Sequence, residues 1–187
     1  RQLIEKADDE TANLAQRVGI GWQEVPVPVI AALHGNVFGG GLQIALGADM
    51  RLIGADTMMS IMEIKWGLVP DMSGTQTLKN LVGLDICKEL TFTGRTVAAD
   101  EAVRLGLATR ICDDPIATAT QLAQEIAARS PDAIRAAKRL LNRAWHADTA
   151  LGLKLEAEAQ MGLIGRPNQL EAVRANFERR APDFDDG

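Results

Sequence analysis

The sequence lacks the features that mark secreted, membrane-spanning and nucleic-acid-binding proteins. Only two of its 187 residues are cysteine. Cys87 and Cys112 are not at metal-ligand spacing, which predicts reduced thiols in a cytoplasmic protein. No apolar run approaches the ~18 residues that a membrane-spanning helix needs, and the first residues do not form a signal peptide. The net charge of −5 arises without a basic block, so we expect neither nucleic acid nor a membrane as a partner.

Histidine is equally scarce. His34 and His146 have no acidic or cysteine partner at a useful spacing, and no nucleophile–His pair stands out. We predict a structural role for His34 and a surface position for His146. No metal site is predicted, and internal repeats and low-complexity segments are absent from the sequence.

The chain also begins without a methionine, inside what looks like a charged helix over residues 2–22. Its apolar face is predicted to carry five residues: Leu3, Ile4, Ala7, Leu14 and Val18. We therefore expect the sequence to be the C-terminal portion of a longer protein.

A strand followed by three glycines is the most distinctive stretch that is present. Residues 29–33 form a short apolar run, as expected of a strand covered on both faces, and a short helix is expected to follow Gly39–Gly41. The glycine spacing fits neither a phosphate-binding P-loop nor a dinucleotide fingerprint. Two interpretations remain open. The glycines permit close packing of helix on strand, or they present backbone N–H groups to an oxyanion that develops during a reaction.

Short strands and helices alternate through the first two thirds of the chain, which indicates an α/β fold. A segment over residues 62–75 has no clean period, is unusually apolar for a surface loop, and is expected to line a site. Further strands are predicted at residues 50–53, 57–61 and 108–112. Helices are predicted at residues 73–81 with Ser73 as N-cap, 84–92 and 98–105.

From Pro115 onward the sequence predicts only helices, over residues 115–129, 131–146, 149–164 and 168–180. We place a domain boundary between residues 129 and 130. These helices carry many apolar residues for their length, so we expect part of their apolar faces to pack on a neighbouring subunit.

Three polar residues are candidates for chemistry. Glu63 lies among apolar neighbours, where a carboxylate resists ionisation and suits proton transfer. Asp71 follows eight residues later and either joins that chemistry or helps to cap the next helix. Gln43 can position a partner through hydrogen bonds but cannot move protons as a carboxylate does.

An ordered set of motifs resembles the crotonase (enoyl-CoA hydratase/isomerase) superfamily along nearly the whole chain. The motifs are Gly39-Gly40-Gly41, Asp49, the run from Met62 to Gln76, Leu90-Thr91-Phe92-Thr93-Gly94-Arg95, Gly106-Leu107-Ala108 and Arg179-Arg180-Ala181-Pro182-Asp183-Phe184. The resemblance implies a crotonase-like spiral of ββα units over residues 1–129 and a helical trimerisation module over residues 130–187. It also implies trimers or hexamers, and an acyl-CoA thioester as substrate, with CoA as part of the substrate and no separate cofactor.

Site residues follow from the same resemblance. Gly40 aligns with a glycine whose N–H helps to form the oxyanion hole, and Glu63 aligns with the second catalytic glutamate of the hydratases. Gln43 stands where the hydratases carry the first glutamate, and Asp71 stands where dienoyl-CoA isomerases carry an acid. Arg179 aligns with a basic residue that reaches a CoA phosphate, often across a subunit boundary; its alternative is an exposed terminal charge.

The resemblance also places the second oxyanion donor and the adenine-binding loop upstream of Arg1. For the acyl group we predict an adaptable apolar pocket lined by Gly39, Gly41, Met62, Trp66 and Pro70, with further methionines nearby.

The predicted function is proton transfer through a thioester enolate in fatty-acid metabolism. Double-bond isomerisation of an enoyl- or dienoyl-CoA fits Gln43 best, because hydration uses two carboxylates to hold and activate one water. The alternatives are an enoyl-CoA hydratase of β-oxidation and a non-catalytic oligomer that binds CoA. A thioester hydrolase or dehalogenase on the same fold is a further possibility.

Overall fold

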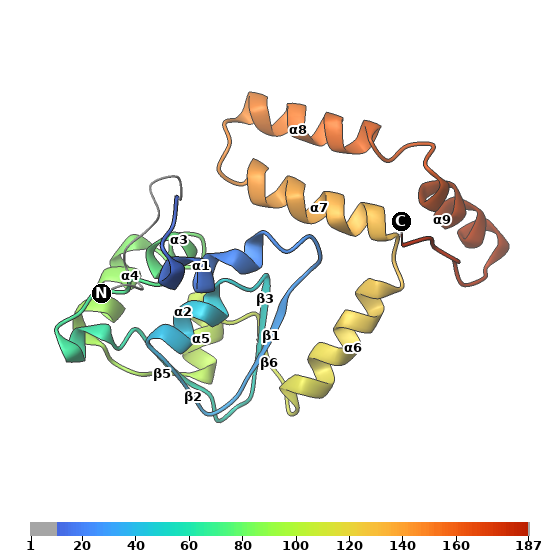
Figure 1. Cartoon of the computed structure of the whole chain (residues 1–187). Helices are drawn as coiled ribbons and strands as arrows, with labels where there is room; N and C mark the ends of the chain where they lie inside the picture. The colour runs from blue at the N-terminus through green and yellow to red at the C-terminus, as the bar shows by residue number, and fades with distance from the viewer. Residues whose placement is uncertain (1–10, 187) are drawn as a thin grey trace. The chain divides into compact units, whose positions relative to one another are not determined.

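The computed structural model describes residues 11–186, which form two compact units (Figure 1). The first, here called the mixed unit, comprises the chain up to Val25 and Val29–Thr120. The second, the helical unit, comprises Pro26–Pro28 and the chain from Gln121 onward. The division falls inside helix α6 (Pro115–Ala127), whereas the predicted domain boundary falls just after that helix.

The strands of the mixed unit form two small sheets. In the first sheet, β3 (Met50–Ile53) lies between β1 (Ile30–Leu33) and β6 (Arg110–Ile111), and all pairs are parallel. In the second, β4 (Met58–Ser60) pairs in parallel with β2 (Asn36–Phe38) and antiparallel with β5 (Val97–Ala98). The first four strands therefore alternate between the two sheets, as expected of a spiral of ββα units, whereas β5 joins β4 in the second sheet.

Strands β2 and β5 are elements that the sequence did not predict. The three residues of β2 lie between Gly35 and the glycine run. A strand of this length shows no usable alternation, and it exists because Asn36–Phe38 pairs with Met58–Ser60 some twenty residues away. The predicted strands at 50–53 and 57–61 are confirmed by β3 and β4.

Helices follow the strands at nearly the predicted positions. Helix α2 spans Gly40–Leu46 and is followed by the 3₁₀ turn η2 (Glu63–Trp66), α3 (Gly74–Leu78), α4 (Leu84–Thr93) and α5 (Ala99–Leu105). Helix α4 ends at Gly94, which adopts a left-handed conformation (φ 58°) as a helix C-cap often does.

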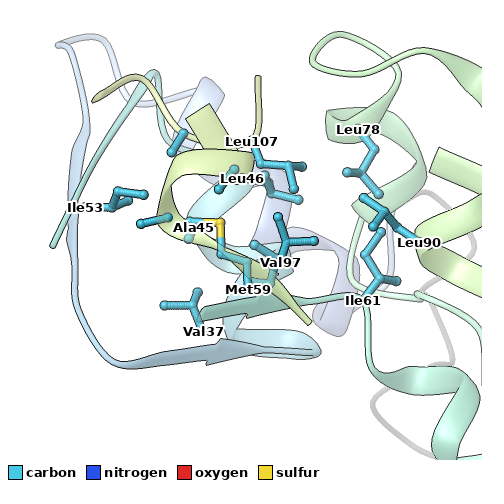
Figure 2. Close-up of a cluster of buried hydrophobic side chains, with 14 residues drawn as sticks. Val37, Ala45, Leu46, Ile53, Met59, Ile61, Leu78, Leu90, Val97 and Leu107 are labelled. Carbon is cyan, nitrogen blue, oxygen red and sulfur yellow. The ribbon is translucent and has the colours of Figure 1, made fainter. Parts of the chain in front are cut away.

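The apolar core of the mixed unit lies between α2 and its neighbours. Figure 2 shows Ala45 and Leu46 from α2 beside Met59 from β4, together with Val97 and Leu107. Met59, Val97 and Leu107 are almost completely buried. Burial of α2 against the sheets fixes the position of the glycines at its start.

The N-terminal helix is shorter than predicted. Helix α1 spans Leu14–Ile20, and the 3₁₀ turn η1 (Gly21–Gln23) follows. Asn13 is the N-cap of a complete capping box with Gln16, so the expected continuous helix over residues 2–22 is wrong at this point. Leu14 and Val18 are exposed, and Leu3, Ile4 and Ala7 lie outside the described residues.

The helical unit contains α7 (Pro131–Ala144), α8 (Thr149–Met161) and α9 (Pro167–Glu178). Helices α7 and α8 pack side by side in Figure 1. Pro131 and Pro167 occupy first helical positions, where the missing N–H has no helical partner to lose. Buried Lys138 donates from Nζ to the Val27 carbonyl at 2.9 Å and so ties Pro26–Pro28 to this unit. No helix within residues 11–186 is long and apolar enough to cross a membrane.

Candidate functional site

The glycine run places backbone groups at the start of α2. Gly39 has φ 51° and ψ −125°, a conformation that favours glycine, and its N–H donates to the Ser60 carbonyl at 2.9 Å. A Cβ built on Gly39 would lie 3.4 Å from Oε1 of Glu63. The glycine therefore lets the chain turn into α2 while a carboxylate lies against it.

Gln43 is buried one turn into α2 and uses both ends of its amide. Its Oε1 accepts from the backbone N–H groups of Met72 at 2.8 Å and Gly74 at 2.9 Å. Its Nε2 donates to Oε1 of Glu63 at 2.6 Å. Because only the oxygen of an amide can accept two N–H donors, these contacts fix the orientation of Gln43 and direct its NH₂ group at Glu63.

Glu63 begins η2 and is only 8% exposed. Its Oε1 accepts the bond from Gln43, whereas Oε2 is buried and makes no hydrogen bond to any other part of the described chain. A buried acceptor without a partner costs about 1–3 kcal/mol, so such atoms need an explanation. A carboxylate that is held at one oxygen and open at the other is suited to accept and return a proton.

Met72 covers the start of α2. A Cβ built on Gly40 would lie 2.8 Å from Sδ of Met72, so the thioether lies directly against Gly40. No acceptor for the Gly40 N–H is found among residues 11–186. Gly41, by contrast, is exposed and faces open space. The backbone N–H of Gly40, the first residue of α2, thus lies in the same neighbourhood as Gln43 and Glu63.

Helix α1 supports the segment that carries Met72. Ser73 Oγ donates to the Gln16 carbonyl, and Gly19 packs so closely on the Met72 carbonyl that a Cβ there would lie 2.1 Å from its oxygen. The absence of a side chain at Gly19 permits this close approach. Ser73 is the N-cap of α3 as predicted, but its side chain makes no capping bond.

Several predicted residues lie at the surface. Asp71 is exposed, and no hydrogen bond to its side chain occurs within the part of the chain that the structure describes, so nothing supports a helix-capping role. Met62 and Pro70 are half-buried, and Trp66 is 78% exposed. Trp66 is therefore a surface side chain in this structure, and its place in an acyl pocket stays a prediction.

The remaining candidates lie away from the Gln43–Glu63 pair in the chain. Arg179 ends α9 in the helical unit, with a left-handed backbone (φ 53°) and an exposed side chain. His34 and His146 are both exposed. His34 was predicted to be structural, and no hydrogen bond of its side chain within residues 11–186 supports that role.

Sequence reasoning missed the residues that hold the pair together. Met72 and Gly74 act through their backbone N–H groups, which any residue type carries. Only the unusual Met72-Ser73-Gly74 segment beside Asp71 could have drawn attention to them.

Comparison with known proteins gives a consistent result. The family model described as enoyl-CoA hydratase/isomerase matches residues 5–187. The short-chain-enoyl-CoA hydratase of Clostridium acetobutylicum is 34% identical over 155 residues, which cover 82% of this chain and 59% of that protein. Mouse methylglutaconyl-CoA hydratase, described as mitochondrial, is 33% identical over 166 residues, which cover 86% of this chain and 53% of that protein.

The fold is similar to that of solved structures. The crystal structure of an enoyl-CoA hydratase from Bacillus anthracis matches with a TM-score of 0.89 and 31% identity, covering 93% of this chain and 68% of the other. The chain spans between about half and two thirds of the length of the curated relatives it matches.

Proposed function

Because this chain belongs to the enoyl-CoA hydratase/isomerase family, we propose that it processes acyl-CoA thioesters by proton transfer through a stabilised enolate. The observation that carries this proposal is the buried Glu63 carboxylate, which has one oxygen held by Gln43 and the other without a partner in residues 11–186. CoA is part of the substrate, and no separate cofactor is required.

The steps follow from the chemistry of these groups. Glu63 removes a proton from carbon 2 of a 3-enoyl thioester, and the electron pair moves to the thioester oxygen. The Gly40 N–H, which makes no other hydrogen bond that the structure describes, donates to that oxyanion. Glu63 then returns the proton at carbon 4, the carbonyl re-forms, and the double bond lies between carbons 2 and 3.

Isomerisation is favoured over hydration by the direct Gln43–Glu63 bond. Hydration requires a water that is both held and deprotonated next to the double bond. Gln43 cannot accept that proton, and its Oε1 is already occupied by two backbone donors. One carboxylate that takes and returns the same proton meets the needs of an isomerase.

The test uses 2-enoyl-, 3-enoyl- and dienoyl-CoA substrates of several chain lengths, with the conjugation absorbance as the signal. We expect faster isomerisation of 3-enoyl- or dienoyl-CoA than hydration of 2-enoyl-CoA. The Glu63→Gln variant should lose about 10²–10⁴-fold in rate, the usual contribution of a positioned acid–base group. Hydration faster than isomerisation at every chain length would contradict the isomerase proposal.

A hydratase of fatty-acid β-oxidation is the second candidate, favoured by the relatives that carry this name. In that case Asp71 has no role, whereas a dienoyl-CoA isomerase could use it as a second acid. Asp71→Asn separates the two, because it should slow dienoyl-CoA isomerisation while leaving hydration unchanged. A non-catalytic CoA-binding oligomer would show unchanged turnover after Glu63→Ala.

Assembly and location complete the proposal. We propose that the helical unit mediates a homotrimer or hexamer, supported by the exposed apolar side chains of Leu153, Met161 and Ile164. Arg179 is proposed to contact a CoA phosphate, and its exposed side chain leaves it available for that contact. A cytoplasmic location stays a prediction, and several matched relatives are described as mitochondrial.

A further inference from the structure

A groove in the helical unit gathers four arginine side chains. It lies between α7, α8 and the turn that follows α8, and its volume is about 500 Å³. Arg135, Arg139 and Arg143 line it from α7, and Arg166 lines it from the turn. We call this feature the arginine groove. Its volume falls within the range of small-molecule sites.

The spacing of these arginines concentrates positive charge. The three residues on α7 are four positions apart, so they lie on one face with about 6 Å of rise between neighbours. Like charges at this spacing disfavour the helix unless something neutralises them. A bound anion would offset this repulsion.

The groove supplies little compensation itself. The side chains of Arg139 and Arg143 make no hydrogen bond or ion pair within the described chain. Arg135 and Arg166 donate only to the neutral carbonyls of Asp186 at 3.0 Å and Gly162 at 3.2 Å. In the same unit Arg180 is paired with two carboxylates, those of Glu171 and Glu178. The arginine groove thus holds four guanidinium groups that have no carboxylate partner of this kind among the described residues.

Two carboxylates line the groove, and each already has another partner. Asp132 Oδ2 accepts from Asn168 at 3.0 Å, and Glu158 lies 3.8 Å from Nζ of Lys154. Four guanidinium groups against two carboxylates leave an excess of two positive charges. A ligand with two negative charges would balance them.

The chemistry of the lining identifies the class of ligand. Guanidinium groups bind phosphate oxygens in a forked geometry, which favours phosphorylated ligands over single carboxylates. Leu140, Leu155 and Leu163 add apolar surface to the same groove, suited to a flat or apolar body. We propose that the arginine groove binds a small phosphorylated ligand with at least two anionic groups attached to an apolar body, such as a nucleoside diphosphate.

None of these residues belongs to the Gln43–Glu63 pair, so the proposal does not rest on the proposed reaction. Two sources share the required chemistry: a free nucleotide and the nucleotide portion of CoA.

The test measures binding of ADP, inorganic pyrophosphate and CoA to the purified protein by calorimetry. The variant is Arg139→Gln with Arg143→Gln. The control is Arg129→Gln with Arg174→Gln, which removes the same charge from exposed positions that do not line the groove. We expect ADP affinity to fall about tenfold or more in the groove variant and to change little in the control.

Competition assigns the source. If CoA displaces ADP from the wild-type protein, the ligand is the nucleotide portion of CoA, and if both bind together it is a free nucleotide. Absence of ADP and pyrophosphate binding, or equal affinity in the two variants, overturns the proposal. A changed native mass of the groove variant without anion binding would instead assign the groove to contact with a second copy. Isomerase activity measured in parallel keeps this result separate from the proposed reaction.

Discussion

At the scale of single residues, an amide at position 43 does what a carboxylate could not do. The Gln43 oxygen receives two backbone N–H groups, and its nitrogen lies 2.6 Å from a Glu63 oxygen. Two ionised carboxylates at that separation would repel each other and would have to share a proton. Gln43 instead donates to Glu63 and leaves its second oxygen open, which is the arrangement that favours a single proton carrier.

The first prediction concerns Gln43→Glu. We expect the acidic limb of the kcat/KM profile for isomerisation to move to higher pH, because the paired carboxylates must share a proton. Hydration of 2-enoyl-CoA should rise relative to isomerisation, because a second carboxylate can now hold the water. Gln43→Ala is the control, since it removes the amide without adding charge and should only slow isomerisation. An unchanged pH profile in Gln43→Glu would contradict the geometry.

The second prediction concerns Gly39→Ala. The backbone conformation of Gly39 (φ 51°, ψ −125°), which residues with a Cβ rarely adopt, should make this substitution cost about 1–3 kcal/mol in the free energy of unfolding. Gly41→Ala is the matched control, because a Cβ there meets nothing within 4 Å. Urea unfolding of both variants gives the comparison. Equal midpoints for the two variants would show that Gly39 is not constrained.

At the scale of elements, strand β3 is tied to its surroundings by a buried arginine. Arg51 donates from Nε to the Leu107 carbonyl at 2.8 Å and from Nη1 to the Ala48 carbonyl at 2.7 Å. Burial lowers the pKa of Arg51, and the charge of Asp49 partly opposes that effect. These bonds link the end of α2, strand β3 and the chain after α5.

The third prediction is that Arg51→Met destabilises the mixed unit by about 2–4 kcal/mol, since two carbonyls lose their donor in a buried setting. Arg110→Met on β6 removes an exposed arginine and should cost much less. The free energies of unfolding of the two variants, measured in urea, test this difference. If Arg51→Met lowered the free energy of unfolding no more than Arg110→Met does, the stabilising role of Arg51 would be contradicted.

Within α9, the carboxylate of Glu171 holds the C-terminal segment that follows the helix. Hydrogen bonds from Arg180 and then from the Asp183 backbone lower the pKa of Glu171 to about 2. Because the pKa is lowered on folding, this carboxylate stabilises the native state above its unfolded pKa of about 4.3. The contribution is lost as the pH falls from about 4 toward the folded value.

The fourth prediction follows from the lowered pKa of Glu171. The stability difference between the wild type and Glu171→Gln should be constant above about pH 5 and should shrink between about pH 4 and pH 2. Urea unfolding at several pH values measures it, with Glu156→Gln on exposed α8 as the control. A difference that grows as the pH falls would contradict the assigned cause.

At the scale of the whole molecule, the helical unit exposes large apolar side chains. Leu153, Met161 and Phe177 of the helical unit expose more than half of their side chains. Exposed apolar residues in such numbers are typical of surfaces that meet another protein. This supports the proposal that the helical unit mediates assembly.

The fifth prediction is a native mass of three or six times that of the chain in multi-angle light scattering. Leu153→Glu with Met161→Glu should shift the protein toward smaller species, because charge on an apolar contact opposes association. Lys154→Glu on the same helix is the control and should leave the mass unchanged. A monomeric wild type would contradict the prediction.

Several elements were predictable from sequence because their signals are local. Apolar runs indicated β1, β3 and β4. A glycine marked the C-terminus of α4, and prolines marked the N-termini of α7 and α9. The ordered motifs around Gly40, Glu63 and Gly94 were sufficient to indicate the family. Strand β2 was not predicted, because three residues show no usable alternation of apolar and polar side chains and the strand depends on pairing with distant β4.

The sequence by itself thus determined the family, the alternation of short strands and helices, and the candidate set of Gly40, Gln43 and Glu63. Only the tertiary structure decided that Gln43 bonds directly to Glu63, that Met72 lies on Gly40, and that Trp66 is exposed. The reason is physical. Local signals act within a turn or two of backbone, whereas the bonds of Gln43 join residues 20 to 31 positions apart.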